Sequence, residues 1–275
     1  MNMTLTRPDE NLTLTFIGVG SAFSKKFYQN NALIVKGKDH ALIDCGTRTP
    51  EALAIIGLSV MDIRNYIITH SHADHIGGLE EVMLLNRYVA KSKPTMIAPL
   101  SYRKFLWKHS LKGGAAYNER VDGKFLRYSD LWNSLDLRPV AGADRQLCET
   151  QIGSIKLAMF RTRHIPDSAP SWRSSSPSYG LVIDDRILYT SDTRYDPELL
   201  EFLGRYYDFE AIFHDCQLYQ GGVHASLDEL DGLPADIKAK TTLMHYGDGV
   251  EKTVNKALAS GFKGFARQWE PYIFS

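Results

Sequence analysis

The chain contains little cysteine and no excess of charge, and both shortages narrow the classes of protein it can be. Only three cysteines, widely spaced, occur in 275 residues. An odd, sparse set is not the disulfide framework of a small secreted protein, so we expect reduced thiols. The 32 basic side chains are balanced by 32 acidic ones. A dedicated nucleic-acid-binding protein usually has a basic excess, which argues against that class but leaves a local basic patch open.

Long apolar runs, internal repeats and low-complexity linkers are also missing. No stretch reaches the roughly 18 consecutive apolar residues that a membrane span requires. The first ten residues lack the basic region and apolar core of a signal peptide. We therefore expect a cytoplasmic protein with no membrane partner. The length allows one substantial core, and we predict one domain over residues 1–275.

The most informative segment that is present is residues 69–76, which read THSHADHI. It places His70, His72, Asp74 and His75 within six positions, in the spacing H-x-H-x-D-H. Imidazole and carboxylate groups are ligands of zinc and of similar first-row ions. The first two histidines leave a strand end on the same side, and the later pair comes from the following turn. This geometry predicts two neighbouring metals, which suit attack on a phosphate or a carbonyl.

Strand-like and helix-like segments alternate along the rest of the chain. Period-two alternation and apolar runs predict strands at 12–17, 32–35, 41–44, 65–69, 152–163, 179–184, 186–191 and 209–213. Helical spacing predicts helices at 79–89, 197–204 and 250–260, and a short helix with Thr49 as its N-cap that ends near Gly57. Strands flanked by helices in both halves predict an α/β (α+β) fold. We expect an αββα sandwich, with two mixed β-sheets packed face to face and helices outside.

The metal motif, the apolar strand before it and the helix after it resemble the metallo-β-lactamase superfamily. The resemblance implies three further ligands just past strand-like runs, namely His164, Asp192 and His245. Taken alone, a histidine at a strand end is more often structural, so these assignments depend on the run at 70–75. One implied metal has the ligands His70, His72 and His164, and the other has Asp74, His75 and His245. Asp192 is implied to bridge them with a water or hydroxide. We expect two zinc ions per chain, and manganese suits the same ligands.

Residues 213–226, FHDCQLYQGGVHAS, resemble the branch that contains RNase Z and its phosphodiesterase relatives. Members of that branch carry a His-Glu pair at the strand end and a later histidine before a helix. The resemblance implies that His224 protonates the leaving oxygen, that Asp215 orients it, and that Asp74 belongs to the same catalytic set. This chain has aspartate where the branch has glutamate, so the pair must approach more closely. The other reading of His224 is an ordinary residue at a helix start.

Within this branch the whole chain resembles the anti-Pycsar phosphodiesterases of phages and bacteria. That resemblance implies a homodimer that hydrolyses 3′,5′-cyclic CMP and UMP, and also cAMP and cGMP, to nucleoside monophosphates. It further implies that the protein counteracts cyclic-nucleotide antiphage signalling, in the host cytoplasm if a phage encodes it. Tyr117 and Ser226 are assigned as substrate contacts, although packing in the dimer interface accounts equally well for Tyr117. Asp44 and Cys45 are expected beneath the metal loop, where Cys45 is equally well explained as a buried structural residue.

Two segments depart from the regular plan. Residues 99–135 contain seven basic and three acidic side chains with seven interleaved aromatics, and Gly113-Gly114 predicts a turn inside them. They form either a solvated amphipathic helix pair, or a lid or dimer arm that brings cations and rings to a phosphorylated base. Residues 165–178, rich in proline and serine, follow His164 directly. They predict a mobile surface loop, with or without substrate contact.

Three other functional classes are compatible with a chain that carries this motif. An RNase Z-type tRNA 3′ endonuclease would have RNA as its partner, but the long basic, glycine-rich arm of that class is missing. A thioester or lactone hydrolase would use the metals on a carbonyl, and the element His214-Asp215 with His224 argues against it. An inactive scaffold is the third alternative, and the complete set of candidate ligands argues against it.

Overall fold

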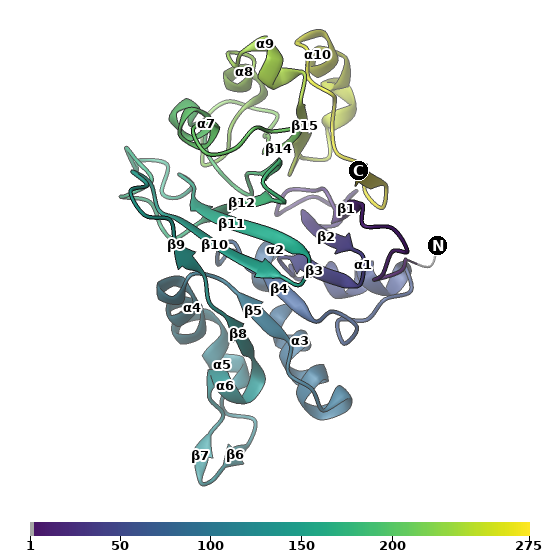
Figure 1. Cartoon of the computed structure of the whole chain (residues 1–275), viewed down its shortest axis with the longest axis vertical. Coiled ribbons are helices and arrows are strands. Elements are labelled where there is room, and N and C mark those ends of the chain that lie inside the picture. The colour runs from purple at the N-terminus through teal and green to yellow at the C-terminus, as the bar shows by residue number, and fades with distance from the viewer. Residues whose placement is uncertain (1–2) are drawn as a thin grey trace.

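The computed structural model describes residues 3–275, and two mixed β-sheets form its centre (Figure 1). The first sheet has the order β16 (Pro271–Phe274), β1 (Leu12–Gly18), β2 (Asn31–Lys36), β3 (Asp39–Ile43), β4 (Asn65–Ile67), β5 (Thr95–Ile97) and β8 (Asn133–Leu135). The second has the order β15 (Thr241–Met244), β14 (Ala211–Asp215), β13 (Ile187–Tyr189), β12 (Tyr179–Ile183), β11 (Ile155–Arg161), β10 (Leu147–Ile152) and β9 (Arg138–Pro139). Each sheet combines antiparallel with parallel pairs, as predicted.

The central strands β12, β13 and β14 of the second sheet are buried on both faces because alternate side chains enter two different cores. In β14, Phe213 enters the core between the sheets, while Ile212 enters a core on the outer face. Phe16 of β1 packs on the ring of Phe213 at 5.3 Å and on that of Tyr189 at 6.2 Å, measured between ring centroids. These contacts join the two sheets face to face.

Helices cover the outer faces of the sandwich. The helices outside residues 99–135 are α1 (Thr49–Ile55), α2 (Ala73–Ile76), α3 (Leu79–Leu85), η1 (Asn86–Ala90), α7 (Pro197–Gly204), α8 (Leu227–Leu230), α9 (Ala235–Lys238), η3 (Val250–Lys252) and α10 (Val254–Ala259). Leu53 of α1 and Val82 of α3 pack in the same core as the first sheet, and Phe202 of α7 packs on the outer face of the second. The predicted αββα sandwich is therefore confirmed. Among helices of residues 3–275, none has the length and apolar character that a membrane span requires.

Residues 99–135, which we call the arm, extend from one end of the sandwich (Figure 1). The arm contains α4 (Leu100–Leu106), η2 (Trp107–Leu111), α5 (Lys112–Ala115), the hairpin β6 (Arg120–Val121) and β7 (Lys124–Phe125), α6 (Tyr128–Leu131) and β8. The turn predicted at Gly113-Gly114 is wrong, since both glycines lie in α5. A Cβ on Gly114 would overlap the carboxylate of Glu80, so the small residue lets α5 approach α3 closely.

The start of α1 also differs from the prediction. The N-cap is Arg48, and Thr49 is the first helical residue. The Thr49 hydroxyl instead donates a hydrogen bond to the side chain of Asn31, which ties the helix to β2. Gly57 follows the end of the helix with φ of 80°, in agreement with its predicted place. The helix expected at 250–260 is divided into η3 and α10.

Candidate metal centre

The candidate ligands gather at one point because each follows the end of a strand. His70 comes after β4, His164 after β11, Asp192 after β13 and His245 after β15. The remaining three lie at the start of α2, where His72 is the N-cap and Asp74 and His75 are in the helix. Residues up to 175 positions apart in the chain, from His70 to His245, thus meet in one cluster. The structure brings together all seven ligands that the resemblance implies.

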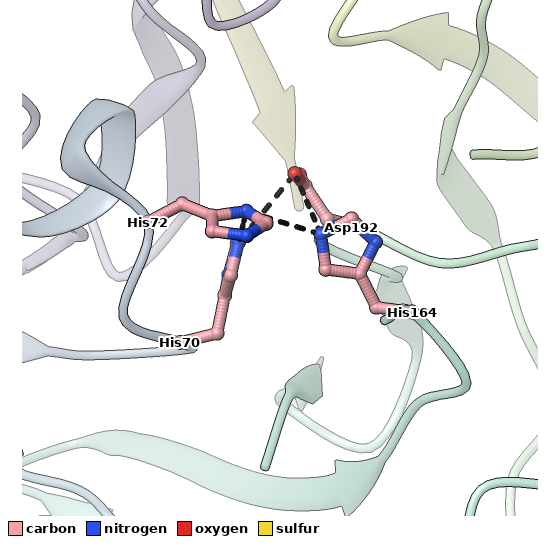
Figure 2. A group of neighbouring side chains, drawn as sticks. All are labelled: His70, His72, His164 and Asp192. Carbon is pink, nitrogen blue, oxygen red and sulfur yellow. Dashed lines mark hydrogen bonds and ion pairs between the residues drawn. The ribbon is translucent and has the colours of Figure 1, made fainter. Parts of the chain in front are cut away.

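The first group consists of His70, His72, His164 and Asp192, whose side chains converge (Figure 2). Nδ1 of His72 lies 3.1 Å from Nε2 of His70 and 3.2 Å from Nε2 of His164. Oδ2 of Asp192 lies 3.6 Å from Nε2 of His70 and 3.8 Å from Nε2 of His164. A tetrahedral zinc ion with Zn–N bonds of about 2.0–2.1 Å holds its ligand atoms roughly 3.3 Å apart. The spacing of this group fits such an ion.

The second group consists of Asp74, His75, His245 and the same Asp192. Nε2 of His75 lies 3.3 Å from Oδ2 of Asp74 and 3.3 Å from Oδ2 of Asp192. Nε2 of His245 lies 3.3 Å and 3.5 Å from the same two oxygens. One oxygen atom, Oδ2 of Asp192, therefore faces the ligands of both groups.

Unpartnered polar atoms support a metal in this place. Both carboxylate oxygens of Asp192 and Nε2 of His75 are buried without a hydrogen-bond partner in the protein. Leaving a charged carboxylate buried in this way is costly unless a counter-charge compensates it. Imidazole nitrogens and carboxylate oxygens are ligands of zinc and manganese, so the donor set fits the predicted class of ion.

The outer nitrogen of most ligand histidines is already engaged, which directs the other nitrogen into the cluster. Nδ1 of His75 lies 2.7 Å from Oδ2 of Asp44, and Nδ1 of His164 lies 2.8 Å from the carbonyl oxygen of Val223. Such outer contacts fix the ring orientation and tautomer of a metal-binding histidine. Burial holds the pKa of His70 well below its usual value and lowers the pKa of His164 to about 4. Neutral imidazoles, the form that binds metal, are thereby favoured in the first group.

The loop beneath the ligands is held by residues of the first sheet. Asp44 also accepts hydrogen bonds from the Thr69 backbone at 2.8 Å and from its hydroxyl at 2.7 Å, in agreement with the predicted supporting role. Asp44 has φ of 61° and His245 has φ of 60°, conformations that side-chain-bearing residues rarely adopt and that often occur at functional sites. Gly46 packs so closely that a Cβ there would overlap the carbonyl of Asp74.

The sequence reading missed Asn31, which ties these loops together. Its Nδ2 donates to the carbonyl of Asp74 at 3.1 Å, and its Oδ1 accepts from the backbone nitrogen of Gly46 at 2.6 Å. Two adjacent asparagines at the start of an apolar strand were the signal that could have indicated it. The buried Cys45 contributes through its backbone, which accepts from Gly78 at 2.9 Å. All three cysteines of the described chain are buried and unpaired.

His224 lies beside the metal groups and is paired with the carboxylate of Asp215. Its Nδ1 lies 2.7 Å from Oδ2 of Asp215, which also accepts from the backbone of Thr193 at 2.8 Å. Nδ1 of His224 is 3.9 Å from Asp192 and is thus nearer to Asp215. Burial by itself would lower the pKa of His224, but the carboxylates of Asp215 and Asp192 together outweigh it and the net shift of the pKa is upward. A protonated histidine is therefore favoured next to the cluster.

The two predicted substrate contacts lie outside the ligand groups. Tyr117 is in the arm, where its ring packs edge-on against Phe125 with 4.9 Å between centroids. Ser226 is buried and caps α8, with its hydroxyl accepting from the Glu229 backbone at 3.2 Å. Its hydroxyl is thus engaged in the cap. Substrate contact by either residue stays a prediction.

The segment after His164 is fastened to the second sheet by Arg161. Nη2 of that arginine donates to the carbonyls of Trp172 at 2.9 Å, Ser175 at 2.9 Å and Ser176 at 3.1 Å. Arg163 adds a hydrogen bond to the carbonyl of Pro170. A serine- and proline-rich segment is thereby held against the strand that leads to the candidate ligand His164.

Comparison with known proteins agrees with this geometry. The family described as Anti-Pycsar protein Apyc1 matches residues 12–272. The Anti-Pycsar protein Apyc1 of Bacillus phage vB_BsuM-Goe3 is 39% identical over 271 residues, covering 94% of this chain and 97% of the relative. That of Paenibacillus sp. (strain J14) is 38% identical over 262 residues, covering 95% and 98%.

Two solved structures share the fold at low sequence identity. The metallo-beta-lactamase fold protein YhfI from Bacillus subtilis superposes with a TM-score of 0.70 at 16% identity, over 96% of this chain and 99% of that one. Human tRNase Z, short form, superposes with a TM-score of 0.64 at 16% identity, over 96% and 99%. These likenesses confirm the metallo-β-lactamase fold. Together with the match over residues 12–272, the identity to the curated relatives shows that this chain belongs to the anti-Pycsar Apyc1 family.

Proposed function

We propose that this protein is a metal-dependent phosphodiesterase that hydrolyses 3′,5′-cyclic mononucleotides to nucleoside monophosphates. The observation that carries the proposal is the single oxygen Oδ2 of Asp192, which faces both ligand groups. His224, paired with the carboxylate of Asp215, lies beside these groups. Membership of the anti-Pycsar family supports cyclic mononucleotides of C, U, A and G as the substrate class. By removing them, the protein counteracts cyclic-nucleotide antiphage signalling, and we propose the cytoplasm as the place of action.

Two zinc ions per chain are the cofactors we propose, with manganese as the alternative. One would be held by His70, His72 and His164, and the other by Asp74, His75 and His245, with Asp192 shared. When bound, two such ions neutralise phosphate charge and make water a nucleophile at neutral pH.

The protein's own contribution to bond cleavage is a proton held at a defined atom. Because Nδ1 of His224 is bonded to Asp215, Nε2 is the nitrogen free to give a proton to the departing ribose oxygen. The carboxylate keeps the ring in one orientation, and its charge raises the pKa of His224, which favours the protonated form that a general acid requires. Asp74 belongs to the same set as a metal ligand, since its Oδ2 lies 3.3 Å from Nε2 of both His75 and His245.

We further propose that residues 1–275 act as one domain, and that a second copy of the chain covers the arm. Exposed aromatic side chains support the second of these proposals, since Tyr117 and Phe125 keep 57% and 43% of their surface accessible near the hairpin. Exposed apolar side chains clustered in this way commonly mark a protein interface. In the dimer, Tyr117 is the arm residue that we expect to reach the substrate. Light scattering of the wild type against Tyr117→Ala/Phe125→Ala tests this, and a wild-type monomer would exclude it.

The test of function is product formation from the 3′,5′-cyclic monophosphates of C, U, A and G, with His72→Ala as control. Turnover of all four substrates that is abolished in the variant is the expected result. A wild-type protein that carries two metals per chain and turns over none of them would reject the proposal. The same preparation would then be assayed on precursor tRNA, with the arm as the candidate RNA surface.

A further inference from the structure

A cavity of about 320 Å³ lies next to the metal centre, on the side of His224 and His245. Three loops line it, at residues 21–23 after β1, 217–219 after β14 and 247–249 after β15. Its volume is in the range of sites for small molecules, about 300–1,000 Å³. Because two metal-centre histidines form part of the wall, a molecule in this cavity would adjoin the place proposed for the phosphate.

Two of the lining side chains are aromatic and exposed. Phe23 keeps 87% of its surface accessible and Tyr219 keeps 68%, so neither ring is covered by the rest of the protein. Rings left this exposed contribute little burial energy to folding. Aromatic faces are the groups on which proteins stack nucleobases, and one such ring strengthens binding by roughly 5- to 150-fold.

The loop that presents Phe23 is fastened in place. Asp248 accepts hydrogen bonds from the backbone nitrogens of Lys25 at 2.9 Å and Lys26 at 3.1 Å, and also from the hydroxyl of Ser24. The ring is thus exposed on an ordered loop next to the site. A loop backbone that is held in advance loses little freedom on binding, which favours affinity.

The third loop supplies space. Gly247 and Gly249 both line the cavity, and a Cβ built on either one meets no atom within 4 Å. Neither glycine has a positive φ, so a side chain could be accommodated there without backbone strain. Glycine at these positions leaves room that a larger residue would fill.

We propose that this cavity is the base subsite, in which the nucleobase of the cyclic nucleotide stacks on Phe23 and Tyr219. The proposal rests on the proposed function, which puts the phosphate at the metals. Stacking uses the face of a base, which all bases share, so the subsite accepts purines and pyrimidines alike. Gln217 also lines the cavity, where its Nε2 donates to the Gly221 carbonyl and its Oε1 is buried without a hydrogen-bond partner.

The experiment compares Phe23→Ala and Tyr219→Ala with the wild type on two kinds of substrate. One kind is the four cyclic nucleotides, and the other is methyl riboside 3′,5′-cyclic phosphate, which has no base. Tyr206→Ala is the control for an exposed aromatic elsewhere, since Tyr206 is 40% accessible. In Phe23→Ala and in Tyr219→Ala, we expect the KM for every cyclic nucleotide to rise at least about fivefold more than the KM for the base-free substrate. Gly247→Leu should raise the same KM values, whereas Gly204→Leu, whose Cβ also meets nothing within 4 Å, should not.

Equal changes in KM for both kinds of substrate, or no change, would overturn the base subsite. If the wild type hydrolyses no cyclic nucleotide, the proposed function fails, and equilibrium dialysis with nucleoside 5′-monophosphates then decides the subsite. The subsite would stand if Phe23→Ala and Tyr219→Ala bind nucleoside 5′-monophosphates more weakly than the wild type does, but bind ribose 5-phosphate equally well. Affinity that is the same in all proteins would reject it.

Discussion

Oδ2 of Asp215 lies 2.7 Å from Nδ1 of His224, so a fully buried carboxylate orients the ring proposed to supply the proton. The shorter aspartate side chain therefore reaches the histidine, although the RNase Z-like branch carries glutamate there. The other oxygen, Oδ1, lies 3.3 Å from Nδ1 of the candidate ligand His245. One carboxylate thus faces both the proposed proton donor and a histidine of the second metal group.

Substitution His224→Ala should lower kcat while leaving metal content intact. A general acid contributes about 10²- to 10⁴-fold to rate, so kcat should fall by that order. The measurement is kcat together with metal per chain by mass spectrometry. Loss of metal equal to the loss of activity would show that His224 is a ligand, as the grouping of Asp192, Asp215, His224 and His245 allows.

Substitution Asp215→Asn should affect both activity and metal binding, because the lost charge faces both His224 and His245. We expect kcat to fall as in His224→Ala, and metal affinity at the second group to fall roughly 10- to 100-fold, as when an outer partner of a ligand is removed. Competition with a chelator measures the affinity. The double variant Asp215→Asn/His224→Ala should be no slower than the slower of the two single variants, since Asp215 and His224 act as a unit. Strictly multiplicative losses would contradict that coupling.

Substitution Asp192→Ala should remove metal from both groups, because the same oxygen faces both. The measurement is metal per chain after dialysis, with His224→Ala treated in parallel as the matched control that keeps its metal. A variant that retains both metals would exclude a bridging role for Asp192. Full retention of one metal would assign the residue to a single group.

Substitution Arg161→Ala should loosen the segment at 165–178, since three carbonyls lose their donor. Hydrogen bonds from a charged group each contribute about 1.5–3 kcal/mol, so the free energy of unfolding should fall by at least that amount. Urea unfolding measures the change, and faster trypsin cleavage after Arg173 would localise it to the segment. Arg138→Ala, at an exposed arginine of β9, is the control. Equal stability and cleavage in both variants would refute the anchoring role.

His40 should make the free energy of unfolding depend on pH. Its buried Nε2 accepts from the backbone nitrogen of Arg64 at 3.1 Å, and burial, with the charge of Arg64, lowers the pKa of His40. Below the unfolded pKa of about 6.5, the unfolded chain binds a proton that the folded protein does not. Stability is therefore complete above that pH and is lost as pH falls, by up to about 1.4 kcal/mol per pH unit. Relative to His40→Gln, the wild type should lose stability between pH 7.5 and pH 5.5, and parallel curves would contradict this.

The fold, and the four candidate ligands between His70 and His75, could be predicted from local sequence patterns. The spacing of His70, His72, Asp74 and His75 holds because a strand end and one helical turn fix the positions of neighbouring residues. Helix boundaries were less certain, since tertiary contacts decided them. Thr49 bonds to Asn31 and does not cap its helix, and Gly114 packs against Glu80 and does not form a turn.

By itself, the sequence determined the two-sheet architecture, the metal-binding character of the site and, through resemblance, which distant residues are candidates to complete the ligand set. Only the tertiary structure decided that Oδ2 of Asp192 faces both groups, that Asp215 faces His245 as well as His224, and that Phe23 and Tyr219 share a cavity. Phe23 and Tyr219 stand 196 positions apart in the chain, and periodicity carries no information over that distance. Their loops meet because the apolar faces of the two sheets pack together, which sets where every strand end lies.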